Sequence, residues 1–133
     1  MRENNSKKLA KEWFKIGDNE FDFAKAGFEE LNAFYPQICF LFQQAVEKYL
    51  KGFLVYYQKK FPKIHDLTEL AKFCSKIDKE FLEFLPKTDI LSQYYLTSRY
   101  PLEYREAGKK EAQEALEIAE EIINIIEIKL RDF

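Results

Sequence analysis

The last part of the chain repeats apolar residues with the period of an α-helix, and this regularity constrains the fold more than any other feature. Between Gly108 and Leu130, apolar side chains recur every three or four residues. The repeated positions are Ala112, Ala115 or Leu116, Ala119, Ile122 or Ile123, Ile126 and Leu130. Spacing of this kind gathers the side chains on one helical face. We therefore expect a helix over residues 108–130 that buries this face.

Two longer patterns in the N-terminal half predict a helical hairpin. From about Asn5 to about Ala33, Leu9, Trp13, Ile16, Phe23 or Ala24, Phe28 and Leu31 keep helical spacing, with Gly17 as the weak point. A second helix starts near Pro36, which the first turn tolerates, and ends before Pro62. Its inner face reads Ile38, Leu41 or Phe42, Ala45, Tyr49, Phe53 and Tyr57. The two helices are expected to run antiparallel.

The middle of the chain predicts shorter elements. Asp66, followed three positions later by Glu69, is typical of a helix N-terminus with a reciprocal carboxylate. The short helix that follows would bury Leu67, Leu70, Ala71 and Cys74. Another short helix is expected from about Lys87 to Leu96. Pro101 removes a backbone donor and restricts the residue before it, so the segment Thr97–Pro101 is expected to be irregular.

These patterns predict an all-α protein, an up-and-down bundle of four main antiparallel helices plus a short one, in a single domain over residues 1–133. The chain has 47% apolar residues but only 4 Gly and 4 Pro, fewer than a sheet-rich fold with many tight turns would use. Trp13 is expected to anchor the core. Ile118, Ile125 and Ile128 widen the apolar face of the last helix. That helix is therefore either central in the bundle or covered by a second subunit, and we favour the dimer contact.

Charge and cysteine usage narrow the environment. The formal net charge is −2, so no global field recruits nucleic acid or an anionic membrane. Cys39 and Cys74 stand inside apolar runs, where free cysteines behave as buried hydrophobes and indicate a reducing cytoplasm. No secretory signal is evident, and no apolar stretch approaches the about 20 residues that span a bilayer. The sequence predicts a soluble cytoplasmic protein.

The common catalytic and cofactor motifs are missing. The sequence contains no Cys-x-x-Cys pair, no His-Glu-x-x-His and no glycine-rich phosphate loop. A single histidine, His65, excludes a site with several histidine ligands, and the Glu-x-x-His motifs of di-iron bundles are absent. We expect neither a metal nor a cofactor.

A run of residues in the second helix, together with two later motifs, resembles the HEPN family, whose name refers to nucleotide binding in higher eukaryotes and prokaryotes. The run is Phe42-Gln43-Gln44-Ala45-Val46-Glu47-Lys48-Tyr49-Leu50-Lys51, followed by Lys63-Ile64-His65-Asp66-Leu67 and by Arg99-Tyr100-Pro101. Trp13, Gly17, Glu20, Phe21 and Ala24 resemble the family's opening pattern, which usually has Ala in place of Gly17 and Asp in place of Glu20. The resemblance covers nearly the whole chain.

The resemblance implies a bundle of four main helices plus a short one, commonly assembled as a homodimer. It also implies a partnership with a separate minimal nucleotidyltransferase, sometimes as toxin and antitoxin. Many members are RNases that carry an arginine and, a few residues later, a histidine. Here Arg99 would be that arginine, but the corresponding position holds Tyr104 and no histidine follows His65. Tyrosine, with an ordinary pKa near about 10, replaces imidazole poorly in acid–base catalysis near neutral pH.

The candidate site residues are those that could hold a nucleotide or RNA phosphate. They are Arg99, Lys48, Lys51, Tyr100, Tyr104 and His65. Arg99 could instead pair with a glutamate such as Glu47, and Lys48 and Lys51 could form a solvated stripe in which Glu47 pairs with Lys51. His65 could simply hydrogen-bond backbone or a facing helix. Residues 47–65 carry five lysines against one glutamate, and residues 103–121 carry seven acids against three bases, so the molecule is expected to be polarised.

Three functions therefore remain open. The first is a non-catalytic HEPN-type module that binds nucleotide or RNA phosphate, interacts with a separate nucleotidyltransferase and forms a homodimer. The second is a metal-independent RNase toxin with Arg99 and Tyr104 in its cleft. The third is a dimeric scaffold that binds a partner through its last helix, whose interface would include Ile125 and Ile128.

Overall fold

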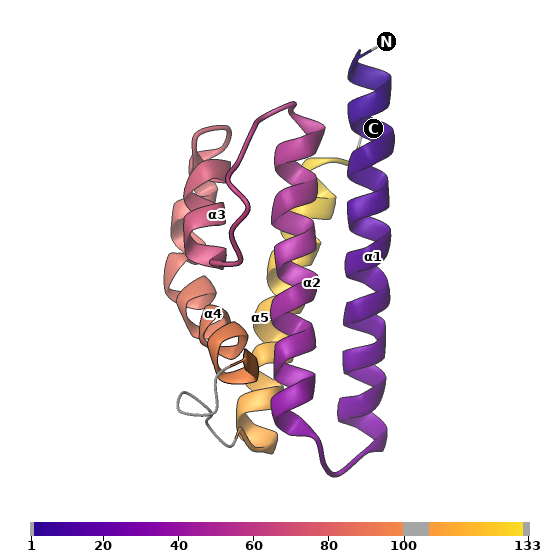
Figure 1. Ribbon diagram of the computed structural model, residues 1–133, viewed down its shortest axis with the longest axis vertical. Coiled ribbons are helices and arrows are strands. Elements are labelled where there is room, and N and C mark those ends of the chain that lie inside the picture. Colours follow the sequence, from indigo (N-terminus) through magenta and orange to yellow (C-terminus); the bar gives the residue numbers. More distant parts are fainter. Residues whose placement is uncertain (1, 100–106, 132–133) are drawn as a thin grey trace.

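The computed structural model describes residues 2–99 and 107–131, with side chains described within residues 5–95 and 107–131. These residues form helices and no strand. In chain order the helices are α1 (Arg2–Glu30), α2 (Tyr35–Tyr56), α3 (Leu67–Ser75), the 3-10 helix η1 (Lys79–Phe84), α4 (Leu85–Arg99) and α5 (Lys109–Lys129). The predicted all-α bundle of four long helices and one short α-helix is confirmed (Figure 1).

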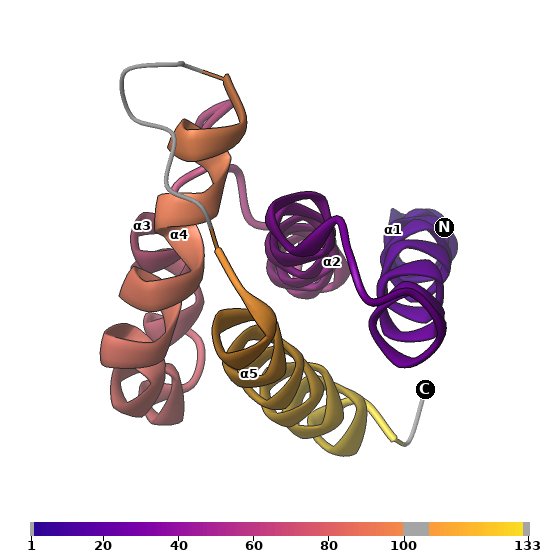
Figure 2. The ribbon, with the colours of Figure 1, turned by 90° about the horizontal axis from the view of Figure 1, so that it is seen from below.

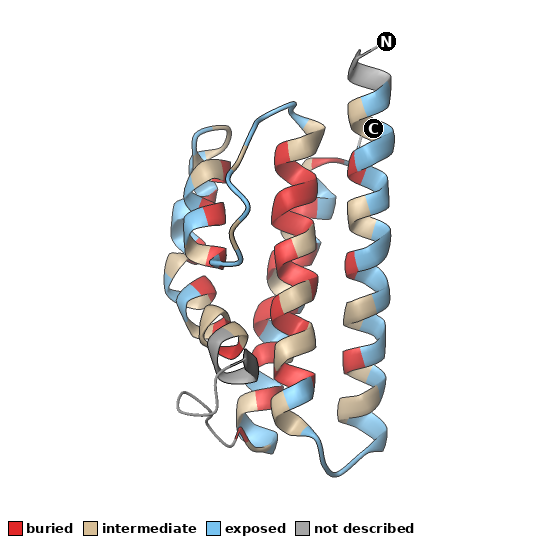
Figure 3. Cartoon of the chain, viewed as in Figure 1, coloured by how far each residue is buried: buried red, intermediate tan, exposed pale blue. Residues whose placement is uncertain are grey.

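Helix α2 is the centre of the bundle. Seen end-on, it lies between α1 on one side and α3 and α4 on the other, and α5 packs alongside it (Figure 2). Burial follows this arrangement, since buried residues recur along most of α2 but only at intervals along α1 (Figure 3). Three polar residues of α2, Gln43, Glu47 and Lys51, are buried together with its apolar side chains. The packing of α2 therefore brings charged groups into the interior.

The predicted antiparallel hairpin of the first two helices is confirmed. Helix α1 ends at Glu30, three residues before the expected end, and α2 begins at Tyr35. Phe34 reverses the chain with a φ of 65°, in the left-handed region. Pro36 occupies the first turn of α2 as expected.

Gly17 was expected to weaken the first helix, but the structure shows a packing role. A Cβ at this position would lie 2.9 Å from Cδ2 of Tyr49 and 3.2 Å from the carbonyl oxygen of Ala45. The absence of a side chain therefore lets the backbones of α1 and α2 approach closely. Gly52 of α2 has the same role toward α1, because a Cβ there would overlap Cε1 of Phe14.

Asp66 caps α3 as predicted, accepting hydrogen bonds from the backbone nitrogens of Thr68 at 2.9 Å and Glu69 at 3.2 Å. Leu67, Leu70, Ala71 and Cys74 are buried, as expected. The Glu69 carboxylate takes a different partner from the expected one, since it pairs with Lys72 at 3.2 Å. The cap thus consists of the Asp66 side chain.

The fourth helix is longer than expected. Helix α4 extends from Leu85 to Arg99, where the sequence predicted a helix from Lys87 to Leu96 and irregular chain from Thr97. The prediction for residues 97–99 was wrong because a proline restricts the residue immediately before it, here Tyr100, and leaves earlier backbone donors intact. Tyr100 and Pro101 themselves lie outside the described residues.

Helix α5 begins at Lys109, and the carboxylate of Glu111 accepts a hydrogen bond from the backbone nitrogen of Gly108 at 2.7 Å. Its widened apolar face is only partly covered. Ile118 is buried in the chain, Ile125 is half-buried and Ile128 keeps 57% of its surface exposed. The expected dimer contact through this helix stays a prediction.

Trp13 is half-buried at the edge of the bundle, so the prediction that it anchors the core was wrong. Helix α1 packs mainly on α2. The Trp13 ring lies beside this helix–helix contact, 5.9 Å from the ammonium of Lys51. Both cysteines are buried and free, as expected. Within residues 2–99 and 107–131, every helix is too short or too polar to cross a membrane.

Candidate functional site

A buried carboxylate in the middle of α2 is the centre of the candidate site. Glu47 is 2% exposed. Its Oε2 lies 3.0 Å from Nζ of Lys51 and 3.1 Å from Nδ1 of His65, and its Oε1 accepts a hydrogen bond of 3.4 Å from Nε2 of Gln43. A buried charge requires such partners, because removal from water is costly unless the charge is paired and hydrogen-bonded. The predicted pairing of Glu47 with Lys51 is confirmed, but the expectation that this pair belongs to a solvated stripe was wrong, because the packing of α2 buries both side chains.

His65 reaches Glu47 from the loop between α2 and α3. Gln43 donates a hydrogen bond of 3.0 Å to the carbonyl oxygen of His65, which fixes the backbone. The imidazole stacks on Tyr95 of α4, with ring centroids 4.4 Å apart and planes 20° from parallel. Helices α2 and α4 thus hold the ring from two sides, and its side chain remains 43% exposed.

The contact with Glu47 determines which imidazole nitrogen carries the proton. An ionised carboxylate only accepts hydrogen bonds, so Nδ1 of His65 is the donor in this pair. In the neutral ring Nε2 is then the acceptor, and ring geometry points it away from Glu47. The neutral imidazole therefore presents a hydrogen-bond acceptor on the side opposite the buried carboxylate.

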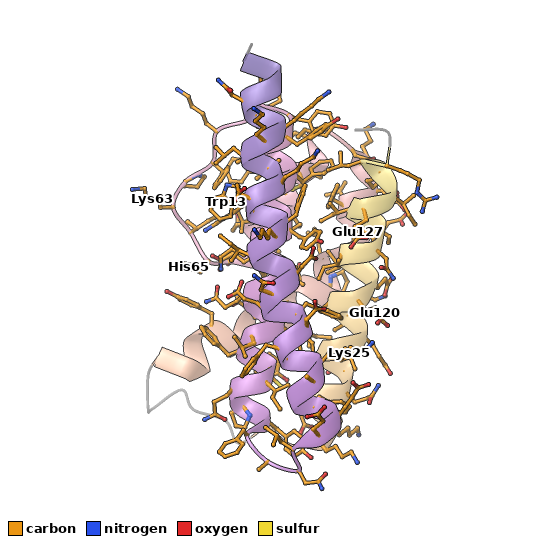
Figure 4. All side chains as sticks on the ribbon, turned by 90° about the vertical axis from the view of Figure 1, so that its right-hand side faces the viewer. Trp13, Lys25, Lys63, His65, Glu120 and Glu127 are labelled. Carbon is orange, nitrogen blue, oxygen red and sulfur yellow. The ribbon has the colours of Figure 1, made fainter. Side chains whose placement is uncertain are left out.

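A pocket of about 370 Å³ adjoins this imidazole. It is lined by Ile64, His65, Asp66, Asp89, Ser92, Gln93 and Tyr95, from the loop before α3 and from α4. Figure 4 shows His65, Lys63 and Trp13 on one side of α1, and Lys25, Glu120 and Glu127 on the other. Among the described residues of the lining, the two aspartates, Asp66 and Asp89, supply negative charge. We call this the histidine pocket.

The two lysines of the predicted phosphate site are paired within the bundle. Lys51 is 7% exposed and lies between Glu47 and the ring of Trp13. Lys48 contacts Glu20 of α1 at 3.2 Å and Gln44 at 3.3 Å. Burial raises the pKa of Glu20, against the opposing effect of Lys48. Lys51 and His65 thus share one partner, Glu47, whereas Lys48 pairs with Glu20 of α1.

The remaining predicted site residues lie at or beyond the end of α4. Arg99 is the last residue of that helix, one turn after Tyr95. Its side chain lies outside the described residues, as do Tyr100 and Tyr104 entirely. Their predicted roles in binding stay predictions.

A second pocket, of about 270 Å³, lies at the end of the bundle where α2 finishes. Its lining combines three lysines with apolar residues, namely Lys59, Lys60 and Lys76 with Leu54, Phe73 and Ile77. These three lysines are exposed, and none forms an ion pair with any described residue. Lys7 of α1 lies 5.7 Å from the ring of Tyr56, the last residue of α2. We call this the lysine pocket.

Sequence reasoning located the lysine-rich stretch but not this pocket. Lys59 and Lys60 belong to the five lysines counted between residues 47 and 65. Lys76 comes from α3's far end, and pairing these segments requires the tertiary fold. Tyr95 was also missed, because a tyrosine on a helix carries no signal that it will stack on a loop histidine.

Two other groups with reactive potential, the Cys39 thiol and the Tyr49 hydroxyl, are favoured in their protonated forms. Burial raises the pKa of the Cys39 thiol to about 12, so this thiol is a poor nucleophile near neutral pH. Burial and a hydrogen bond to Asp18 raise the pKa of Tyr49, whose hydroxyl also contacts Glu127 at 3.3 Å. No three acidic, cysteine or histidine side chains in the described part of the chain are arranged to hold a metal ion.

The comparison with family models agrees with the motifs of α2 and the loop after it. Residues 10–129 match the HEPN domain. The chain belongs to the HEPN family. This match includes every described residue of the histidine and lysine pockets.

A solved structure supports the same fold. The HEPN chain is similar to the crystal structure of ST0689, an archaeal HEPN homologue, with a TM-score of 0.72 and 23% sequence identity. The alignment covers 90% of this chain and 96% of that chain. No curated protein matches the sequence. The similarity therefore establishes the fold, and the chemistry rests on the side chains described above.

Proposed function

We propose that this HEPN protein is a non-catalytic module that binds nucleotide or RNA phosphate and interacts with a separate minimal nucleotidyltransferase. The observation that carries the phosphate-binding part is the lysine pocket. Lys59, Lys60 and Lys76 surround it, and no described carboxylate neutralises them. Clustered ammonium groups attract phosphates even when the net charge of the protein is slightly negative.

The surroundings of the lysine pocket suit a nucleic acid as well as a free phosphate. The exposed ring of Tyr57 and the half-buried ring of Tyr56 stand at the end of α2, 4.9 Å apart between centroids. Aromatic rings beside a basic groove stack bases with little sequence preference. Single-stranded RNA therefore fits this end of the bundle better than a compact inorganic anion does.

Binding of a fluorescently labelled single-stranded RNA, measured by anisotropy at several salt concentrations, tests the phosphate-binding part. The double variant Lys59→Glu/Lys60→Glu should bind at least about 10-fold more weakly and show a shallower salt dependence. Lys109→Glu/Lys110→Glu is the matched control, because it makes the same charge change at the start of α5, at the opposite end of the bundle (Figure 1). Equal losses in both double variants would contradict a site at the lysine pocket.

The partnership is a separate part of the proposal and has its own test. Family resemblance supports it, and affinity purification of the tagged protein from its own host should recover a nucleotidyltransferase in stoichiometric amount. Recovery of the protein alone, in repeated gentle purifications, would contradict the partnership and leave the RNA-binding result untouched.

A metal-independent RNase is the second candidate, because a buried carboxylate holds the ring of His65 through Nδ1, so that the neutral imidazole presents Nε2 as an acceptor. A general base needs this kind of orientation. The carboxylates of Asp66 and Asp89 in the same pocket repel a phosphodiester, however, and this favours the non-catalytic function. RNA cleavage by the purified protein that is lost in His65→Ala would reverse this preference.

A further inference from the structure

The histidine pocket differs in charge from the lysine pocket and suits a different ligand. Among the described residues, its lining contains two aspartates and no lysine or arginine; the side chain of Arg99, one turn after Tyr95, lies outside the described residues. A phosphate in this pocket would meet like charge, which costs binding energy. The histidine pocket is thus unsuited to the ligand proposed for the lysine pocket.

The polar groups of the histidine pocket mostly accept hydrogen bonds. In the neutral imidazole of His65, Nε2 is an acceptor because Nδ1 carries the proton that is donated to Glu47. Oδ1 of Asp66 receives the two backbone donors of the α3 cap, and Oδ1 of Asp89 receives the hydroxyl of Thr68. In each aspartate, Oδ2 receives no hydrogen bond from the described residues. The ligand must therefore supply several donors.

The wall of the histidine pocket is flat and apolar. Tyr95 and His65 stack within 4.4 Å of each other, and Ile64 adds an aliphatic surface. Planar groups pack on such a wall better than tetrahedral ones do. A planar cation with several N–H donors meets all three requirements of charge, hydrogen bonding and shape.

We propose that the histidine pocket binds a guanidinium group carried on an alkyl stem. A guanidinium is planar, stays charged at physiological pH and presents five N–H donors that match carboxylates. A volume of about 370 Å³ accommodates the stem as well as the head group, with Ile64 beside the stem. The group comes either from an arginine side chain of a protein partner or from a small free guanidino compound.

This proposal is independent of phosphate binding, since it uses a different pocket. It extends the interaction part of the proposed function, because an arginine inserted into an acidic aromatic pocket is an effective anchor for a protein partner. Asp89 and Asp66 provide the charge, and Tyr95 provides the surface for stacking.

Titrations followed by two-dimensional NMR of the full chain test the proposal with small probes. N-acetyl-arginine methylamide should bind at least about 10-fold more tightly than its citrulline analogue, a neutral compound of nearly the same shape, and than its lysine analogue. Asp89→Asn and Tyr95→Leu should each weaken the arginine probe several-fold, whereas Asp22→Asn, the same change on the exposed surface of α1, should not.

Agmatine distinguishes the two sources of the guanidinium. Tighter binding of agmatine than of the capped arginine would identify a small free compound, and tighter binding of the capped arginine would identify a side chain. Equal binding of the citrulline and arginine probes would overturn the proposal, and so would an unchanged affinity in both Asp89→Asn and Tyr95→Leu. Asp89→Asn carries the test if Tyr95→Leu fails to fold.

The two proposals fail in distinguishable ways. Lys59→Glu/Lys60→Glu should lose RNA binding and keep binding of the arginine probe. Asp89→Asn should do the opposite. Loss of both activities in either variant would indicate a general disturbance of the fold and contradict the assignment of two separate pockets.

Discussion

Glu47 and His65 are 18 positions apart in the chain, and their side chains meet with Oε2 of Glu47 3.1 Å from Nδ1 of His65. Glu47 is simultaneously the partner of Lys51, at 3.0 Å. The buried carboxylate therefore links the interior of α2 to the loop that leads into α3. Its removal affects a structural ion pair and the orientation of a pocket residue at once.

Replacement of Glu47 by alanine should destabilise the protein by about 3 kcal/mol or more, because it leaves the buried ammonium of Lys51 unpaired. The free energy of unfolding in urea measures this change. Glu69→Ala is the control, since Glu69 also pairs with a lysine of its own helix, at 3.2 Å, but both side chains are half-exposed. That change should cost less than about 1 kcal/mol. Equal effects of the two substitutions would show that burial adds nothing to the Glu47 pair.

Two glycines of α1 should respond in opposite directions to alanine. At Gly17 a Cβ would lie 2.9 Å from the ring of Tyr49, so Gly17→Ala should cost about 1–3 kcal/mol through overpacking. At Gly27 the nearest atoms are 3.6 Å away on Ile38, which is ordinary contact. Gly27→Ala should therefore stabilise by up to about 1 kcal/mol through helix propensity. Thermal unfolding of the two variants gives the signs, and a stabilising Gly17→Ala would contradict the close approach of α1 and α2.

The sequence predicted the elements whose signals are local. Helical spacing located α1, α2 and α5, and Asp66 with Glu69 three positions later located the start of α3. Helix ends were predicted less accurately. Pro101 was expected to disrupt the helix from Thr97 onward, and α4 was therefore predicted too short. These errors concern helix boundaries, where a single residue such as proline favours an end while the preceding helical turns favour continuation.

The candidate site was predictable only where it lies within one helix. The pairing of Glu47 with Lys51 follows from a spacing of four residues, and the structure confirms it. The contacts of His65 with Glu47 and Tyr95 join a loop to two helices, and Lys76 meets Lys59 and Lys60 across the fold. Tertiary packing decides these contacts, and no local pattern of the single sequence encodes them.

The ion pair of Asp78 with Lys129, at 2.6 Å, should make stability depend on pH in the acid range. The hydrogen bond from Lys129 lowers the pKa of Asp78 below its ordinary value of 3.8. A lowered carboxyl pKa means that the stabilisation is fully present above pH 3.8 and is lost as the pH falls through the lower folded-state value. Asp78→Asn should therefore destabilise at pH 7 and have little effect at the acid end.

The asparagine substitution isolates the charge of Asp78. Its carboxylate also caps η1, accepting a hydrogen bond from the backbone nitrogen of Glu80 at 3.0 Å, and asparagine caps about as well as aspartate. Asp66→Asn is the control, because Asp66 caps α3 but forms no ion pair with any described residue. Urea unfolding at several pH values should show a larger pH-dependent loss for Asp78→Asn than for Asp66→Asn.

Exposed apolar side chains make the association state testable at two faces. Ile128 of α5 is 57% exposed, whereas Phe23 of α1 is 70% exposed and Ile16 of the same helix 47%. We predict a homodimer through α5, because Ile125 and Ile128 continue the apolar face of that helix beyond what its neighbours cover.

Light scattering after size exclusion should then give a dimer for the parent protein and for Phe23→Asp, and a monomer for Ile128→Asp. Because Ile128 is exposed, its replacement leaves the core intact, and a change in mass reports on the interface. A monomer with Phe23→Asp and a dimer with Ile128→Asp would move the interface to α1, and a monomeric parent protein would contradict the homodimer itself.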